Sequence, residues 1–313
     1  MSESAAPASN SHSPHDIKPI QVLQLSIAGV DCPAIWQSSD SDVAVIMVNG
    51  GAQTRVGSHR QYIRLSRSLA RVNIASLRFD LPGFGDHSGP STDFLTIHQL
   101  LPDICRQLLQ AQPKIKRLIL LGLCDGASAI VLSQPLLPAN CIGFILINPW
   151  VRQEQSYART MLKDYYLKRL TSVELWRKIF SGRVAITSFF REISRLLRQN
   201  WKSRSAPTEQ TRLCVNATVD NFVQLMKNHW QQNVGKVMVL TSGQDLTASE
   251  FLNLCHSDPQ FKALLAAADW RHAEDANHTF ASIDQQHWLE QQVCQFVDLL
   301  AFSTNEDSIK RVQ

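Results

Sequence analysis

The amino-acid sequence predicts an α/β fold, in which a mostly parallel central sheet is flanked by helices and carries a helical cap insertion. The first observation is that short, continuously apolar segments alternate with longer segments of helical periodicity, a pattern typical of parallel strands that are covered on both faces. The second is that this alternation stops after residue 150 and starts again at residue 236. Functional residues of such a sheet belong at the carboxyl ends of its strands.

Each apolar segment of the alternating part predicts a strand, and each amphipathic segment predicts a helix. The first two apolar segments, 22–29 and 34–37, predict a hairpin. The later predicted strands are 43–51, 72–80, 117–122, 141–150, 236–243 and 269–273. The predicted helices are 59–71, 95–111, 125–137 and 285–302.

Charge separates the interrupting region from the rest of the chain. Residues 151–235 hold 15 Lys and Arg against 6 Asp and Glu, whereas the whole chain of 313 residues has a net charge of only +4. We interpret this region as a basic helical cap on an α/β core formed by residues 19–150 and 236–303. The Ser-, Ala- and Pro-rich residues 1–18 predict a disordered tail, and residues 304–313 are expected to form a second tail.

The cysteines of the chain are scattered and include no Cys-x-x-Cys pair. This pattern indicates neither a zinc site nor a redox dithiol, so we expect no metal and no cofactor. Unpaired thiols, the lack of a secretory signal and the lack of an apolar stretch of about 18 residues favour a cytoplasmic protein. The seven cysteines are Cys32, Cys105, Cys124, Cys141, Cys214, Cys255 and Cys294.

The segment GLCDGAS, residues 122–128, has the frame of a nucleophile elbow, with Cys124 at the position where serine is usual. Such an elbow is a sharp turn between a strand and a helix, and Gly122 and Gly126 are the small residues that relieve its crowding. A helix N-terminus also favours a thiolate over a thiol. The sequence therefore predicts that Cys124 is a nucleophile; the alternative is a tight turn that contains a buried cysteine.

A nucleophile of this kind needs a general base and a carboxylate that orients the base, in the chain order nucleophile, acid, histidine. Asp245 directly follows the predicted strand 236–243, and His278 follows the predicted strand 269–273. We therefore predict a triad of Cys124, His278 and Asp245.

Other histidines and aspartates are weaker candidates for the base and the acid. His272 lies within a predicted strand, and His256 and His287 lie within predicted helices. Asp269 and Asp275 are so close to His278 in the sequence that we interpret them as strand-edge and loop residues.

The oxyanion hole is predicted from the same turn and from the glycine-rich loop NGGAQTRVGSHR, residues 49–60. One donor is the amide of Asp125, the residue after the nucleophile, and the second is the amide of Gly51 or Ala52. The alternative for this loop is a simple glycine turn.

Three residues are candidates for substrate binding. Gly50 allows the backbone to approach a substrate, Arg55 could meet an anionic group, and Trp150 ends the strand next to the elbow. The alternative for Arg55 is a solvated charge on a helix face.

These segments, together with RFDLPGFGDHSG, SGQDLT and ANHTF, resemble the α/β-hydrolase superfamily in kind and in order, over roughly residues 43–302. The cysteine elbow is similar to those of dienelactone hydrolases and polyhydroxyalkanoate synthases, which act through Cys, Asp and His. VNGGAQTRVGSHRQY, GLCDGAS and NPWVR resemble the α/β-hydrolase associated with the exosortase A system, which is encoded beside exopolysaccharide genes. That resemblance implies a genetic neighbourhood and no particular reaction.

We expect acyl transfer through Cys124, with hydrolysis of an ester or thioester as the outcome and a small-molecule, acylated saccharide or lipid as the substrate. A cysteine also leaves open an acyltransferase with an acceptor other than water. A third alternative is a non-catalytic partner protein that kept the fold.

The predicted cap raises a question about partners. In residues 186–201, apolar side chains at helical spacing lie opposite Arg191, Arg195 and Arg198. This helix is expected to pack on its own domain, and the alternative is peripheral contact with an anionic membrane. Nucleic-acid binding is disfavoured, because the basic region lacks a recognition motif.

Overall fold

The computed structural model describes residues 18–151 and 217–310, with side chains described as far as Phe302. The predicted N-terminal tail, apart from Lys18, and most of the predicted cap, including its arginine-bearing helix, lie outside these residues. Within the described ranges, no helix is long and apolar enough to cross a membrane.

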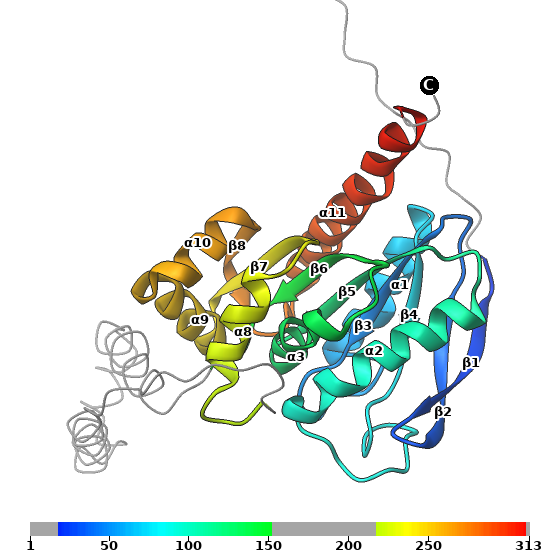
Figure 1. Ribbon diagram of the computed structural model, residues 1–313, viewed down its shortest axis with the longest axis horizontal. Helices are drawn as coiled ribbons and strands as arrows, with labels where there is room; N and C mark the ends of the chain where they lie inside the picture. The colour runs from blue at the N-terminus through cyan, green and yellow to red at the C-terminus, as the bar shows by residue number, and fades with distance from the viewer. Residues whose placement is uncertain (1–17, 152–216, 311–313) are drawn as a thin grey trace, which may run out of the picture.

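Eight strands form one sheet in the order β1-β2-β4-β3-β5-β6-β7-β8 (Figure 1). β1 pairs with β2 and β2 with β4 in antiparallel fashion, and all the other neighbours are parallel. The predicted fold class is therefore confirmed. The strands are β1 (Ile20–Ile27), β2 (Val30–Gln37), β3 (Val43–Val48), β4 (Ala75–Arg78), β5 (Arg117–Leu123), β6 (Cys141–Ile147), β7 (Lys236–Gln244) and β8 (Asp269–Asn277).

Helices cover both faces of this sheet, because successive side chains of each central strand point to opposite sides. In β3, Ala44, Ile46 and Val48 join one core cluster, which includes residues of α2 (Phe94–Ala111), α3 (Asp125–Ser133) and α8 (Phe222–Gln231). Val43, Val45 and Met47 join the other cluster, with α1 (Gln61–Arg71) and α11 (Ile283–Lys310). The other helices of residues 18–151 and 217–310 are α9 (Leu246–Ser257) and α10 (Pro259–Ala267), and short 3-10 turns cover Ser58–Arg60 and Gln134–Leu136.

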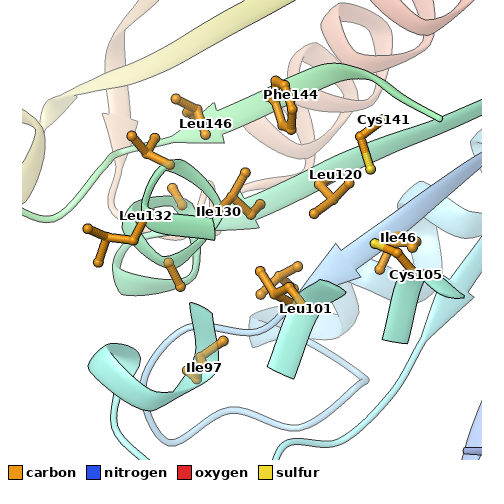
Figure 2. Packing of buried hydrophobic residues seen from close by; sticks show 14 of the residues in the cluster. Ile46, Ile97, Leu101, Cys105, Leu120, Ile130, Leu132, Cys141, Phe144 and Leu146 are labelled. Atoms are coloured by element: carbon orange, nitrogen blue, oxygen red, sulfur yellow. The ribbon is translucent and has the colours of Figure 1, made fainter. Parts of the chain in front are cut away.

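Figure 2 shows the packing of the first cluster, in which Leu101 and Cys105 of α2 face strand residues such as Ile46 and Leu120. Cys105 also interacts with Cys141, and this interaction together with burial raises the pKa of Cys105. Both thiols are buried and act as small apolar side chains in the core.

The structure differs from the sequence-based elements mainly at their ends. Strands predicted to include NGG, FD and NPW stop at Val48, Arg78 and Ile147, because the backbone turns away from the sheet at these polar or glycine-rich ends. The last strand, in contrast, extends to Asn277, and α11 continues to Lys310, into the predicted C-terminal tail.

One helix within the predicted cap belongs to the core. α8 lies in the range 151–235, yet its Phe222, Met226 and Trp230 are buried in the first core cluster. The helix packs against α3 and α10 and covers the sheet between β6 and β7, as a crossover helix does. This helix therefore belongs to the core and not to the predicted cap, whose residues 152–216 lie outside those that the structure describes.

Candidate active site

Cys124 occupies a strained turn between β5 and α3. Its φ of 59° and ψ of −124° lie in a region that non-glycine residues rarely adopt. The turn is held by a hydrogen bond of 2.9 Å from the Cys124 amide to the carbonyl oxygen of Ile147 on β6. The Cys124 side chain is half-buried, so the sulfur stays accessible at the carboxyl end of the sheet.

The glycines that flank the elbow are required by close backbone approach. A Cβ on Gly126 would lie 2.8 Å from the carbonyl oxygens of Val48 and Asn49, and a Cβ on Gly122 would lie 2.7 Å from the carbonyl carbon of Gly126. Both distances are shorter than van der Waals contact. The Gly-x-Cys-x-Gly spacing of the sequence thus corresponds to a turn that is packed directly against β3.

The structure brings the three predicted triad residues together. His278, directly after β8, places its Nδ1 2.8 Å from Oδ2 of Asp245, directly after β7. Cys124 lies close enough to His278 to contribute to the raised pKa of its imidazole. The Asp245 side chain is only 6 % exposed and His278 is 32 % exposed, so the acid is shielded while the imidazole faces the site.

The electrostatics of this arrangement favour a protonated imidazole. Burial opposes the charge on His278, but hydrogen bonds and charge interactions with Asp245 and Cys124 outweigh it and raise the pKa of His278 to about 10. An imidazolium next to a sulfur is the arrangement in which a cysteine is held as a thiolate by an ion pair.

Asn148 is a positioning residue that the sequence reasoning missed. It is fully buried with a φ of 44°, and its Nδ2 donates to Ser242 Oγ at 2.9 Å and to the carbonyl oxygen of His278 at 3.0 Å. Its Oδ1 accepts a hydrogen bond from the Ser242 amide at 2.9 Å. A polar residue directly after the continuous apolar run of β6 was the available signal.

The predicted oxyanion loop lies beside the elbow. Gly51 has a φ of 58°, and the carboxyl of Asp125 lies against the neighbouring Gly50, on which a Cβ would be 2.3 Å from Oδ1. No hydrogen bond from the Ala52 amide to another described residue is present. The carboxyl of Asp125 thus lies between the two parts of the predicted oxyanion hole.

The side chain of Arg55 is paired with carboxylates of the protein itself. Its guanidinium forms ion pairs with Asp80 and Asp86, and its amide donates to Asp80 Oδ1 at 2.6 Å. Asp80 is fully buried, so its charge requires these partners. These ion pairs give Arg55 a structural role, in which the RFDLPGFGD segment holds the oxyanion loop, and contact of Arg55 with an anionic group of the substrate stays a prediction.

Trp150 lies next to the elbow, as expected of a residue that contacts a substrate. Its amide donates to the carbonyl oxygen of Cys124 at 3.3 Å, and its own carbonyl oxygen accepts from Ser128 Oγ at 2.5 Å. The indole stacks on Phe222 with ring centroids 5.4 Å apart, and Phe94 meets both rings edge-on. Trp150 is half-buried, whereas Phe94 and Phe222 are buried.

The competing residues lie elsewhere. His272 is within β8, where its Nδ1 lies 2.8 Å from Thr241 Oγ1, and His256 and His287 lie within α9 and α11. Asp269 pairs with Arg271, and Asp275 is an exposed residue of β8. Among the described residues, no group of three His, Cys, Asp or Glu side chains could hold a metal ion.

The profile described as the alpha/beta hydrolase family matches residues 45–292. No curated protein matches the chain.

Several solved structures share the fold at low sequence identity. An esterase from Pyrococcus furiosus is 15 % identical with a TM-score of 0.58, over 90 % of each chain. A protein described as a CIB-like hydrolase from Thermoplasma acidophilum is 11 % identical with a TM-score of 0.54, over 89 % of this chain and 98 % of that one. An alpha-beta serine hydrolase homologue from Coxiella burnetii is 10 % identical with a TM-score of 0.52, over 88 % of this chain and 96 % of that one.

Proposed function

Because the chain belongs to the alpha/beta hydrolase family, we propose that it is a hydrolase that transfers acyl groups through a Cys124, His278 and Asp245 triad. The observation that carries the proposal is the continuous chain of contacts from Asp245 through His278 to Cys124 at the carboxyl edge of the sheet. Esters and thioesters are the substrates that such a triad attacks.

The reaction begins with attack of the Cys124 sulfur on the carbonyl carbon of the substrate. A carbon–sulfur bond forms, and the electron pair of the carbonyl double bond moves to oxygen, where backbone amides of Asp125 and of Gly51 or Ala52 stabilise the charge. The tetrahedral intermediate then expels the leaving group, which takes a proton from His278 Nε2, and an acyl-thioester remains on Cys124.

Water completes the cycle. His278, now neutral, takes a proton from a water molecule whose oxygen attacks the thioester carbonyl, and the sulfur of Cys124 leaves as the acid product forms. Asp245 remains ionised throughout, and its hydrogen bond to Nδ1 keeps Nε2 directed at the sulfur.

The substrate proposed is an acylated saccharide or lipid of exopolysaccharide metabolism. This part rests on the resemblance of VNGGAQTRVGSHRQY, GLCDGAS and NPWVR to the exosortase A-associated hydrolases. A second outcome, transfer of the acyl group to an acceptor hydroxyl, is favoured by the nature of the nucleophile, because a thioester reacts more readily than an ester with such acceptors.

The test compares Cys124→Ala with Cys294→Ala, which removes a second half-buried thiol, on α11. The wild type and the Cys294 variant are expected to form a covalent acyl adduct with p-nitrophenyl acetate, seen by mass spectrometry, and the Cys124 variant is expected to form none. An unchanged adduct in the Cys124 variant would show that the nucleophile is misassigned. Wild-type protein that forms no adduct with any ester or thioester donor would favour a non-catalytic partner protein.

A further inference from the structure

β1 forms one edge of the sheet, so half of its backbone amide and carbonyl groups point away from β2 (Figure 1). In an antiparallel pair, these groups belong to every second residue. Ser26 is one such residue. Its amide donates to Gln107 Oε1 at 2.8 Å, and its carbonyl oxygen accepts from Gln107 Nε2 at 2.7 Å. The side chain of Gln107, on α2, thus covers the edge at this position.

The same side of β1 is open further along the strand. Ile20, Val22 and Gln24 alternate in step with Ser26, so their backbone groups point in the same direction. The register agrees, because Gln24 lies opposite Pro33, which has no amide hydrogen to offer across the pair. No hydrogen bond joins the outward amides and carbonyl oxygens of these three residues to another residue of the described ranges.

The two edges of the sheet differ in how they are protected against pairing. β8 carries charged residues such as Asp269, Arg271 and Glu274, and its register with β7 is irregular. Charges and irregularities of this kind keep an edge strand from pairing with another chain. β1, with the sequence IQVLQLSI, has no charged residue, proline or glycine, and its register with β2 is continuous. β1 therefore lacks the features that prevent pairing.

The side chains of β1 also leave apolar surface at this edge. Leu25 and Ile27 are buried in the first core cluster, and Leu23 packs against it. On the opposite face of the strand, Ile20 is 53 % exposed and Val22 is 61 % exposed. A second strand at this edge covers both side chains and also supplies partners for the outward backbone groups.

We propose that β1 pairs with β1 of a second copy of this chain, in antiparallel orientation and with Val22 opposite Val22 on a twofold axis. The open stretch is symmetric about Val22, so Ile20 of each copy lies opposite Gln24 of the other. A strand without charge does not repel its own copy, which makes β1 self-complementary. The two sheets then join into one continuous sheet.

The dimer is expected to be weak, because the open stretch is short and ends where Gln107 covers Ser26. Interfaces that bury less than about 1,000 Å² in total are commonly transient. Dimers of the full-length protein are therefore expected to form as its concentration rises toward about 100 µM, which sedimentation velocity measures.

Two variants at the proposed axis test the pairing. Val22→Lys and Val22→Asp each place two like charges opposite each other, so each alone is expected to weaken dimerisation about 10-fold or more. An equimolar mixture of the two variants is expected to restore the dimer, with one copy of each. Val234→Lys is the matched control, because it makes the same change at a fully exposed valine outside β1, and it is expected to dimerise as the wild type does.

Gln24→Pro tests the backbone contact separately from the side chains. It removes an amide hydrogen that points away from β2, so the pairing of β1 with β2 is expected to survive, as proline is tolerated on edge strands in this orientation. Its melting temperature is therefore expected to stay close to that of the wild type, while dimerisation weakens. Hydrogen exchange at Ile20, Val22 and Gln24 is expected to slow as the wild-type concentration rises.

Three results would overturn the proposal. The first is a wild type that stays monomeric at about 100 µM; if the Val22 and Gln24 amides of that monomer are protected at every concentration, another segment of the same chain covers the edge. The second is a dimer that persists in Val22→Lys, Val22→Asp and Gln24→Pro, which places the interface elsewhere. The third is a mixture of the two charged variants that stays monomeric, which contradicts the twofold axis at Val22.

Discussion

The carboxylate of Asp245 joins His278 to the start of α9. Its Oδ2 lies 2.8 Å from His278 Nδ1 and 3.0 Å from the Ala248 amide, and its Oδ1 accepts from the Thr247 amide at 3.1 Å. Asp245 is thus both the helix cap and the group that orients the imidazole. A cap that is fixed by two amides has little freedom to rotate, so the imidazole receives a fixed partner.

Two substitutions of Asp245 separate these roles. Asp245→Asn keeps an oxygen for the cap and is expected to stay close to wild type in stability, whereas Asp245→Ala is expected to lose about 1 kcal/mol because the cap is gone. Both are expected to lower the acylation rate about 100-fold or more, because the imidazole loses its charged partner. Urea unfolding and burst kinetics measure the two effects. An asparagine variant with the wild-type acylation rate would contradict the orienting role.

The raised pKa of His278 predicts a loss of stability at alkaline pH. The folded-state pKa of about 10 lies above the unfolded value of about 6.5, so the stabilising contribution of the imidazolium is fully present below pH 6.5 and is lost as pH rises through 10. The difference in melting temperature between wild type and His278→Gln is therefore expected to shrink from pH 6 to pH 10. A difference that stays constant over this range would show that the imidazolium is not stabilised by Asp245 and Cys124.

The buried His98 and the half-buried His229 predict the opposite dependence at acid pH. Burial lowers the pKa of His98 and of His229, whose Nδ1 lies 2.9 Å from the carbonyl oxygen of Leu132. Below about pH 6.5 these two histidines are protonated more readily in the unfolded state than in the folded state. The free energy of unfolding is therefore expected to fall as pH decreases below about 6.5. His98→Gln is expected to weaken this dependence in melting curves between pH 7 and pH 5. If melting temperature changes with pH by the same amount in wild type and in His98→Gln, burial of His98 is not a cause of the acid dependence.

Asn148 is expected to matter for activity although it touches no reacting atom. Asn148→Ala removes the donors to Ser242 and to the His278 carbonyl and also places an alanine at a φ of 44°, so a loss of about 2–3 kcal/mol in unfolding free energy is expected. Asn148→Gly removes the same hydrogen bonds without the backbone strain. Both variants are expected to acylate more slowly, with iodoacetamide alkylation changed less. A glycine variant with the wild-type acylation rate would assign Asn148 to stability alone.

The ion pair of Arg55 and Asp80 predicts that substitutions of the two residues have non-additive effects on the free energy of unfolding. Arg55→Met leaves the fully buried Asp80 carboxylate without its cation and is expected to cost about 3 kcal/mol. The double variant Arg55→Met, Asp80→Asn is expected to recover part of this loss, because no unpaired charge remains. Urea unfolding of the two single variants and the double variant gives the coupling energy, and strictly additive losses would contradict the pairing.

The parts of the site that follow strand ends could be predicted from the sequence. Cys124, Asp245 and His278 each come directly after an apolar run, and parallel strands place their carboxyl ends on one edge of a sheet. The positions of these residues directly after strands were enough to predict that they lie close together, because the position of a strand end depends on backbone topology alone.

Contacts that depend on side-chain rotation could not be predicted from the sequence. Arg55 and Asp80 are 25 residues apart, and nothing in either segment shows that the guanidinium turns toward the core rather than toward a substrate. The carboxyl of Asp125 likewise could have pointed to solvent. α8 was assigned to the cap because its neighbours carry no strand signal, and β8 was drawn too short because an edge strand with one solvated face keeps polar residues such as Glu274.

The end of β6 connects the proposed nucleophile, Cys124, to the proposed base, His278. The carbonyl oxygen of Ile147 holds the Cys124 amide, and the next residue, Asn148, holds the backbone of His278. Chimeras that exchange the segment after this strand with that of a relative should therefore join the chains after Val151, which is buried in the core. A junction placed only four residues earlier, after Ile147, would replace Asn148, which holds the backbone of the base, and the graft would change reactivity along with substrate range.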